Sequence, residues 1–112
     1  DGVFKEESLK NIPPFLLRKY FTRTSRGRWL INDSVKRIVS FKKHNLFDEP
    51  PFKYMDVIFC RNVRIYFDTK QAQQVLLRIY SSLRKGGYFV LGKVETMPVF
   101  LKKYFVVVEK CY

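Results

Sequence analysis

Arg61, Asn62 and Tyr66 are the residues whose types and placement could do chemistry. They follow Met55 to Cys60, an apolar run typical of a strand buried on both faces. A guanidinium binds anions, an asparagine amide donates and accepts hydrogen bonds, and a tyrosine hydroxyl can donate one. If the strand lies in an open parallel sheet, these side chains emerge at its carboxyl edge, where such sheets bind ligands.

A purely structural interpretation of the same residues stays open. Asn62 could satisfy loop backbone, Arg61 could pair with a surface acid, and Tyr66 could pack with Phe67 in the core. Residue types alone do not separate this interpretation from a binding site.

A second polar element favours a site. His44-Asn45-Leu46 follows the strand-like stretch Val39 to Phe41, so two strand ends each deliver an asparagine. His44 is the only histidine, and no partner base or metal ligand accompanies it. We therefore expect a loop hydrogen bond from His44, and we expect no metal site.

An amphipathic helix is predicted from Thr69 to Arg84. Asp68 and Gln71 form a capping-box pattern at its start, and Gly86 is expected as the C-cap glycine. The apolar positions on one face are Ala72, Val75, Leu76, Ile79 and Leu83.

Two apolar runs flank this helix. Met55 to Cys60 and Tyr88 to Leu91 are continuously apolar, and strand–helix–strand is the pattern of a right-handed βαβ crossover. A third strand is expected in Tyr104 to Tyr112. The sequence thus predicts an α/β fold.

The N-terminal part predicts smaller elements. Prolines before an apolar run predict a short helix from Pro14 to Tyr20. Trp29 to Ile31 and Arg37 to Lys42 are β-like stretches on either side of the turn formers Asn32-Asp33-Ser34, which predict a small β-hairpin.

Composition places the chain among single globular domains or pieces of larger ones. It has 112 residues, of which 46% are hydrophobic and 17% aromatic, enough for a packed core. No apolar run is long enough to span a membrane and no signal peptide is evident, so a soluble cytoplasmic protein is expected. Cys60 and Cys111 are interpreted as reduced structural cysteines.

The net charge of +12 would attract polyanions, which include nucleic acid, acidic protein surfaces and anionic membranes. Because the basic residues occur only in short clusters, a solvated basic surface is an adequate explanation. Trp29, Tyr54 and Tyr80 could stack on bases, but core packing explains them more simply. We therefore expect no nucleic-acid partner and no membrane insertion.

The sequence resembles a family over nearly its whole length. The motif Phe59-Cys60-Arg61-Asn62-Val63 with Ile65-Tyr66-Phe67, followed by the helix and "LRKGGYFVLGKVE", is similar to the C-terminal half of CheR-type chemotaxis receptor methyltransferases. "GVFKEESL" and "FLLRKYF" extend the resemblance towards the N-terminus. These enzymes use S-adenosylmethionine to methylate glutamate side chains on the cytoplasmic helices of receptors.

The resemblance implies roles for individual residues. The family's cofactor contacts correspond to Asn45, Leu46, Arg61 and Asn62. Tyr66 matches the tyrosine near the methyl-transfer centre. Arg61 would orient an anionic group.

Two positions depart from the family pattern. Glu95 matches the glutamate of the family's Gly-x-Ser-Glu segment, but Val94 stands where serine is usual, so the resemblance leaves a polar role there open. Arg64 replaces an apolar residue, and we interpret it as facing solvent.

The resemblance also implies an incomplete fold. The chain starts Asp1-Gly2, which suggests a cut or processed end, and none of its five glycines forms the Gly-rich cofactor turn. The expected architecture over residues 1–112 is a class I, Rossmann-like methyltransferase sheet that lacks its first two strands. Such a segment is expected to bind cofactor weakly or not at all by itself, to be inactive alone and to associate with itself.

Two functions therefore follow from the resemblance and the charge. The first is a segment of an S-adenosylmethionine-dependent protein-glutamate methyltransferase that acts on acidic receptor helices. The alternative is a non-catalytic basic module that docks on acidic receptor or partner helices without turnover.

Overall fold

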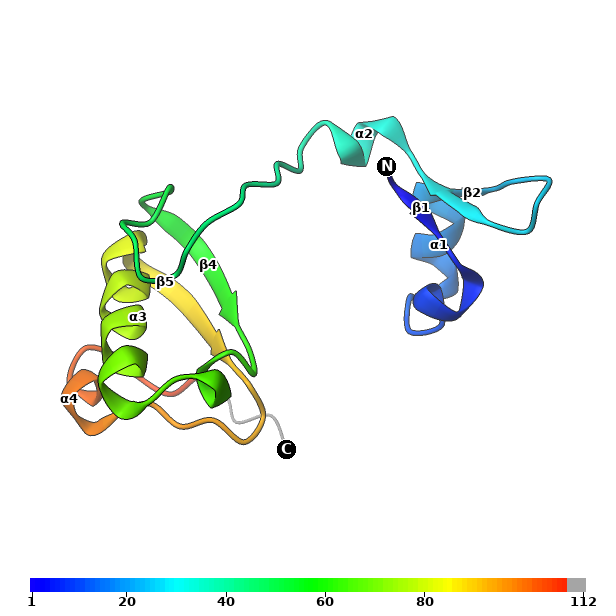
Figure 1. The fold of residues 1–112 in the computed structure, drawn as a ribbon. Coiled ribbons are helices and arrows are strands. Elements are labelled where there is room, and N and C mark those ends of the chain that lie inside the picture. The colour runs from blue at the N-terminus through cyan, green and yellow to red at the C-terminus, as the bar shows by residue number, and fades with distance from the viewer. Residues whose placement is uncertain (109–112) are drawn as a thin grey trace. The chain divides into compact units, whose positions relative to one another are not determined.

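The computed structural model describes residues 1–108, which fall into two compact units, residues 1–42 and the residues from 43 onward (Figure 1). Among the described residues, no helix has both the length and the apolar character needed to cross a membrane.

The first unit is built on a three-stranded antiparallel sheet in the order β1-β3-β2. Its elements along the chain are β1 (Val3–Phe4), a 3-10 helix η1 (Glu6–Leu9), α1 (Pro14–Tyr20), β2 (Phe21–Arg23), β3 (Trp29–Ile31) and α2 (Asp33–Lys36). The predicted helix Pro14–Tyr20 and the strand at Trp29 are confirmed, and β2 with β3 form a hairpin.

The predicted strand Arg37 to Lys42 is wrong. The chain forms α2 at the expected turn formers and then continues without regular structure. Ile38 and Phe41 are 83% and 92% exposed. A strand is stabilised by a hydrogen-bonded neighbour, and no described strand pairs with this segment.

The second unit contains a two-stranded parallel sheet, β4-β5, whose strands are joined through α3. Its elements are β4 (Met55–Cys60), a 3-10 helix η2 (Arg64–Tyr66), α3 (Thr69–Ser82), β5 (Leu83–Leu91) and α4 (Val99–Lys102). Figure 1 shows α3 lying beside β5, with β4 on the far side of β5. The predicted α/β fold and the parallel strand–helix–strand unit are confirmed.

Helix α3 begins where the sequence predicts. The Asp68 carboxylate accepts a hydrogen bond from the Gln71 N–H at 2.8 Å, and the Gln71 side chain accepts one from the Asp68 N–H at 3.1 Å. From the predicted face, Ala72, Val75 and Leu76 are buried. This helix face therefore supplies half or more of the buried apolar core of the second unit, to which Cys60 and Leu101 also belong.

The predicted end of α3 is wrong by two residues. The hydroxyls of Ser81 and Ser82 both donate to the Arg78 carbonyl, and Leu83 turns to extended backbone to pair with Met55. Serine side chains that bond to the preceding turn compete with helix continuation. Gly86, with a φ of 78°, lies in the irregular start of β5 and is not a helix cap.

The C-terminal segment also differs from the prediction. Tyr104 to Val108 form no strand, and the remainder of that predicted strand, with Cys111, lies outside the described residues. Instead, Tyr104 packs on Tyr80 of α3, and Phe105 contacts both Tyr80 and Phe89 of β5. The segment therefore covers apolar surface of the helix and sheet.

Only one side of β4 is well covered. Cys60 is buried, whereas Val57 and Phe59 are 45% and 72% exposed. The prediction of a strand buried on both faces is therefore not met within the described residues.

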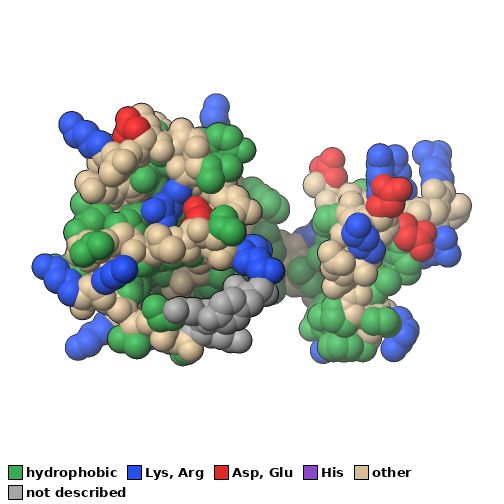
Figure 2. Space-filling model, turned by 90° about the horizontal axis from the view of Figure 1, so that it is seen from below, with side chains coloured by type: hydrophobic (Ala, Val, Ile, Leu, Met, Phe, Trp, Pro, Cys, Tyr) green, Lys and Arg blue, Asp and Glu red, His purple; other side chains and the backbone are tan. Residues whose placement is uncertain are grey.

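Basic side chains are distributed over both units. Figure 2 shows Lys and Arg side chains spread over the visible face of each unit. Ion pairs join Arg23 to Glu6, Lys36 to Asp33, Arg78 to Glu49 and Arg84 to Asp56.

Candidate functional site

Arg61 and Asn62 follow directly after β4, at the carboxyl edge of the parallel sheet. Asn62 has a φ of 58°, a left-handed conformation that is uncommon for a residue with a Cβ and that asparagine tolerates better than most. The backbone thus turns sharply at Asn62. Arg61 is exposed and makes no hydrogen bond or ion pair with any described residue, so the predicted alternative of a surface ion pair is not observed.

The Glu95 carboxylate joins the ends of β4 and β5. Its Oε2 atom accepts hydrogen bonds from the Asn62 N–H at 3.0 Å and from the Gly92 N–H at 2.6 Å. A turn closed by the Glu95 N–H and the Gly92 carbonyl directs this side chain back to the strand end. Glu95 therefore has a polar role, which the sequence had left open. Val94 is 87% exposed, so the position that differs from the family pattern faces solvent.

Arg64 lies next to this junction and does not face solvent as predicted. It is half-buried, and its Nη1 donates to the Thr96 carbonyl at 2.7 Å. Its Nε and the Glu95 Oε1 are buried and have no hydrogen-bond partner among the described residues. Arg64 thus ties η2 to the loop after β5.

The Cys60 thiol reports on the charges at this junction. Burial raises its pKa above the ordinary value, the Glu95 carboxylate raises it further, and the Arg64 guanidinium partly lowers it. Cys60 is a buried free cysteine, as predicted.

Tyr66 ends η2 and projects into solvent. Its side chain is 79% exposed, and its hydroxyl has no hydrogen-bond partner among the described residues. The open alternative that Tyr66 packs in the core is therefore wrong. Phe67 contacts Phe47 edge-to-face at 5.1 Å between ring centroids, and this anchors the neighbouring backbone.

Asn45 and Leu46 lie in the connection that precedes β4. The Asn45 side chain accepts a hydrogen bond from the Phe47 N–H at 3.2 Å and so forms a local turn. Leu46 is half-buried. The Phe47–Phe67 contact brings this turn and the Tyr66 segment together, but no hydrogen bond joins Asn45 to Arg61, Asn62 or Tyr66 in the described part of the chain.

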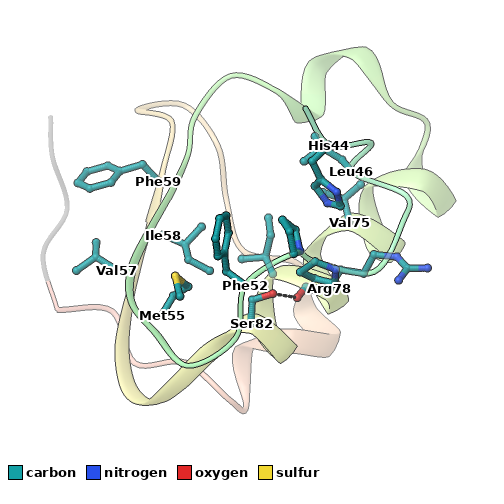
Figure 3. Close-up of a pocket in the computed structure, with 13 residues that line it drawn as sticks. His44, Leu46, Phe52, Met55, Val57, Ile58, Phe59, Val75, Arg78 and Ser82 are labelled. Carbon is teal, nitrogen blue, oxygen red and sulfur yellow. Dashed lines mark hydrogen bonds between the residues drawn. The ribbon is translucent and has the colours of Figure 1, made fainter. Parts of the chain in front are cut away.

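An apolar cavity of about 310 Å³ lies between this connection, β4 and α3 (Figure 3). Figure 3 shows His44, Leu46, Val75 and Arg78 on one side of it and residues of β4 on the other. The lining residues are His44, Leu46, Pro50, Pro51, Phe52, Met55, Val57, Ile58, Phe59, Val75, Arg78, Ile79 and Ser82. Leu46 is the one predicted site residue among them.

The structure thus gathers Arg61 and Asn62 with three residues that sequence reasoning did not assign to the site: Arg64, Gly92 and Glu95. A glycine directly after a strand with an acid three positions later was the available signal. That spacing permits the turn, but the partner of the acid is 33 residues away at Asn62.

Comparison with known proteins identifies the domain. A family model described as "CheR methyltransferase, SAM binding domain" matches residues 1–111. A chemotaxis protein methyltransferase from Borreliella burgdorferi is 38% identical over 99 residues, which cover 87% of this chain and 35% of the relative. A chemotaxis protein methyltransferase from Vibrio parahaemolyticus is 37% identical over 105 residues, which cover 92% and 38%.

A third relative, chemotaxis protein methyltransferase Cher2 from Pseudomonas putida, is 39% identical over 82 residues, which cover 72% of this chain and 30% of the relative. The chain therefore spans between 30% and 38% of the length of these relatives. The family description names SAM, S-adenosylmethionine, as the cofactor. Because the match covers residues 1–111, the chain belongs to the CheR methyltransferase family, within its SAM-binding domain.

Proposed function

We propose that this chain is a segment of an S-adenosylmethionine-dependent methyltransferase that methylates glutamate side chains on chemotaxis receptors. The observation that carries the proposal is that Arg61 and Tyr66, beyond the carboxyl end of β4, are exposed and have no polar partner within residues 1–108. The similarity to chemotaxis protein methyltransferases supports the reaction class.

The side chains present fit one side of S-adenosylmethionine. The exposed guanidinium of Arg61 suits a carboxylate, the asparagines at positions 45 and 62 offer amide donors and acceptors, and the half-buried Leu46 offers apolar surface. Arg61 and Asn62 would hold the cofactor together with Asn45 and Leu46.

We propose that the rest of the cofactor site lies outside these residues. In a complete class I sheet, a Gly-rich turn after the first strand of that sheet and an acid after its second strand complete the cofactor site. These two strands are not β1 and β2 of this chain, and β4 would lie next to the first of them. The exposed Val57 and Phe59 on β4 are consistent with a missing neighbour.

When bound, S-adenosylmethionine supplies an electrophilic methyl group on its sulfonium. A substrate glutamate has an ordinary pKa of about 4.3 and is ionised at neutral pH, so the protein needs no general base. Its residues contribute by positioning, which can be worth about 7 to 11 kcal/mol. Arg61 orients an anionic group, which is the cofactor carboxylate or the substrate glutamate, and the Tyr66 hydroxyl donates a hydrogen bond near the reacting centre.

Paired variants in the full-length protein test these roles. We expect Arg61→Ala and Tyr66→Phe to lower the initial rate of methyl transfer from labelled S-adenosylmethionine to receptor, by roughly tenfold or more for a lost charge-assisted hydrogen bond, with unchanged thermal midpoints. Tyr54→Phe is the matched control, since Tyr54 is 81% exposed and Tyr66 79%. Normal turnover by both site variants would refute the assignment.

The second candidate is a non-catalytic basic module that docks on acidic receptor or partner helices. The net charge of +12 and its spread over both units favour it. Binding to receptor helices by a full-length protein that neither binds S-adenosylmethionine nor methylates the receptor would support this candidate over the enzyme.

A further inference from the structure

We propose that Glu95 is a positioning residue, whose carboxylate fixes the turn after β4 and thereby holds Arg61 and Asn62 toward the cofactor. The inference rests on the proposed function, because it assigns Glu95 to that same site. Glu95 itself touches neither cofactor nor substrate in this scheme.

One carboxylate oxygen makes both connections. Glu95 Oε2 accepts from the Asn62 N–H at 3.0 Å and the Gly92 N–H at 2.6 Å. Asn62 lies two residues beyond Cys60 and Gly92 one residue beyond Leu91, and Cys60 and Leu91 are paired in the sheet. Hydrogen bonds to a charged acceptor are stronger than neutral ones. The two hydrogen bonds to Glu95 therefore couple the carboxyl ends of β4 and β5 at the point where the site begins.

The conformation of Asn62 gives this contact its importance. A φ of 58° is less favourable than extended backbone even for asparagine, which tolerates it better than most residues, so contacts around Asn62 help to hold it. The only hydrogen bond that the Asn62 N–H makes among the described residues is the one to Glu95. Losing it would free the backbone to relax to extended conformations and would reorient Arg61, the preceding residue.

Gly92 admits the carboxylate because it has no side chain. A Cβ at this buried position would collide with Glu95 Oε2 and would lie 2.5 Å from Asn62 Oδ1. Asn62, Gly92 and Glu95 therefore form one unit, the strand-end clamp, in which each residue needs the other two.

Charged groups, as well as the close fit at Gly92, characterise the strand-end clamp. Glu95 Oε1 is buried and unpartnered among the described residues, and so is the Nε of the nearby Arg64. Glu95 and Arg64 shift the pKa of Cys60 in opposite directions, which places both charges near the end of β4. Burying a carboxylate oxygen without a hydrogen-bond partner costs free energy, so space filling alone does not account for an acid at this position.

Two readouts test the proposal. Amide hydrogen exchange of this chain measures the strand-end clamp, and calorimetric titration of the full-length protein with S-adenosylmethionine measures cofactor affinity. We expect Glu95→Ala to remove exchange protection at both Asn62 and Gly92 and to weaken affinity roughly tenfold or more, as expected for a charge-assisted hydrogen bond. Glu95→Gln, whose carbonyl oxygen can still accept both hydrogen bonds, should restore protection and most of the affinity.

Gly92→Ala keeps Glu95 but displaces its carboxylate, and it should reproduce Glu95→Ala, so it replaces that variant if Glu95→Ala does not fold. Glu49→Ala removes an exposed carboxylate in the same unit, paired with Arg78, and should change neither readout. Persistent protection in Glu95→Ala, or lost protection with unchanged affinity, would overturn the proposal. A wild-type protein that fails to bind S-adenosylmethionine while both amides stay protected would overturn the proposed function and leave the strand-end clamp standing.

Discussion

At the scale of single residues, the end of β4 combines exposed and buried chemistry. Arg61 and Tyr66 present to solvent polar groups that have no partner in the described part of the chain. Cys60 is buried, and the Glu95 carboxylate accepts hydrogen bonds from two backbone N–H groups. The placement of Arg61 and Asn62 was predictable, because it follows from one apolar run and its end. The role of Glu95 was not, because it depends on a contact with Asn62 that only the folded sheet creates.

The raised pKa of Cys60 should make the stability of the fold depend on pH. Its folded-state pKa is raised, so folding favours the protonated thiol. The associated stability is fully present below the ordinary pKa of a cysteine and is lost as the pH rises through the folded-state pKa, by at most about 1.4 kcal/mol per pH unit. We expect the unfolding free energy of wild type to fall with pH in this window more steeply than that of Cys60→Ala, measured by urea titration. Parallel curves for the two proteins would contradict the prediction.

At the scale of elements, boundaries set by local signals were predicted better than boundaries set by pairing with a distant strand. The start of α3 is set by Asp68 and Gln71, three residues apart, and the predicted capping box is present. Its end is set by the pairing of Leu83 with the distant Met55. The same contrast explains the missing strand after α2, since a strand requires a partner that periodicity cannot supply.

The capping box should contribute measurably to stability. Asp68→Ala removes the acceptor of the Gln71 N–H and should lower the unfolding free energy by about 1 kcal/mol. Urea unfolding followed by circular dichroism measures this. Lys70→Ala, an exposed change in the same helical turn, is the control, and an equal effect of both changes would show that the cap contributes nothing.

At the scale of the whole molecule, two properties extend beyond any one element. The first is the incomplete cover of β4, which pairs only with β5 in the described sheet and exposes Val57 and Phe59. The second is the net charge of +12. The net charge follows directly from the amino-acid composition, whereas the exposed surface of β4 could be identified only from the structure.

The open surface of β4 should make this chain associate with itself, since an unpaired edge is a template for another strand. Light scattering with size-exclusion chromatography should show oligomers that Phe59→Ser reduces. Phe41→Ser, a change at an equally apolar and 92% exposed position in the other unit, should leave them unchanged. A monomeric wild-type chain would refute this expectation.

The charge should serve docking on acidic helices rather than on nucleic acid. We expect the affinity for a glutamate-rich receptor helix to fall as salt rises, because exposed charges are screened over about 8 Å at physiological ionic strength. Fluorescence anisotropy at several salt concentrations measures it. Tighter binding to random duplex DNA than to the receptor helix would count against the prediction.

The parallel pairing of β4 with β5 also has a consequence during synthesis. Ile58 pairs with Phe89, which the ribosome adds about 30 residues later, an interval of roughly 2 to 6 s at ordinary translation rates. Throughout that interval the nascent strand holds its hydrogen-bonding groups and its apolar side chains without their final partner. Among the described strands, β4 therefore waits longest for the strand with which it pairs.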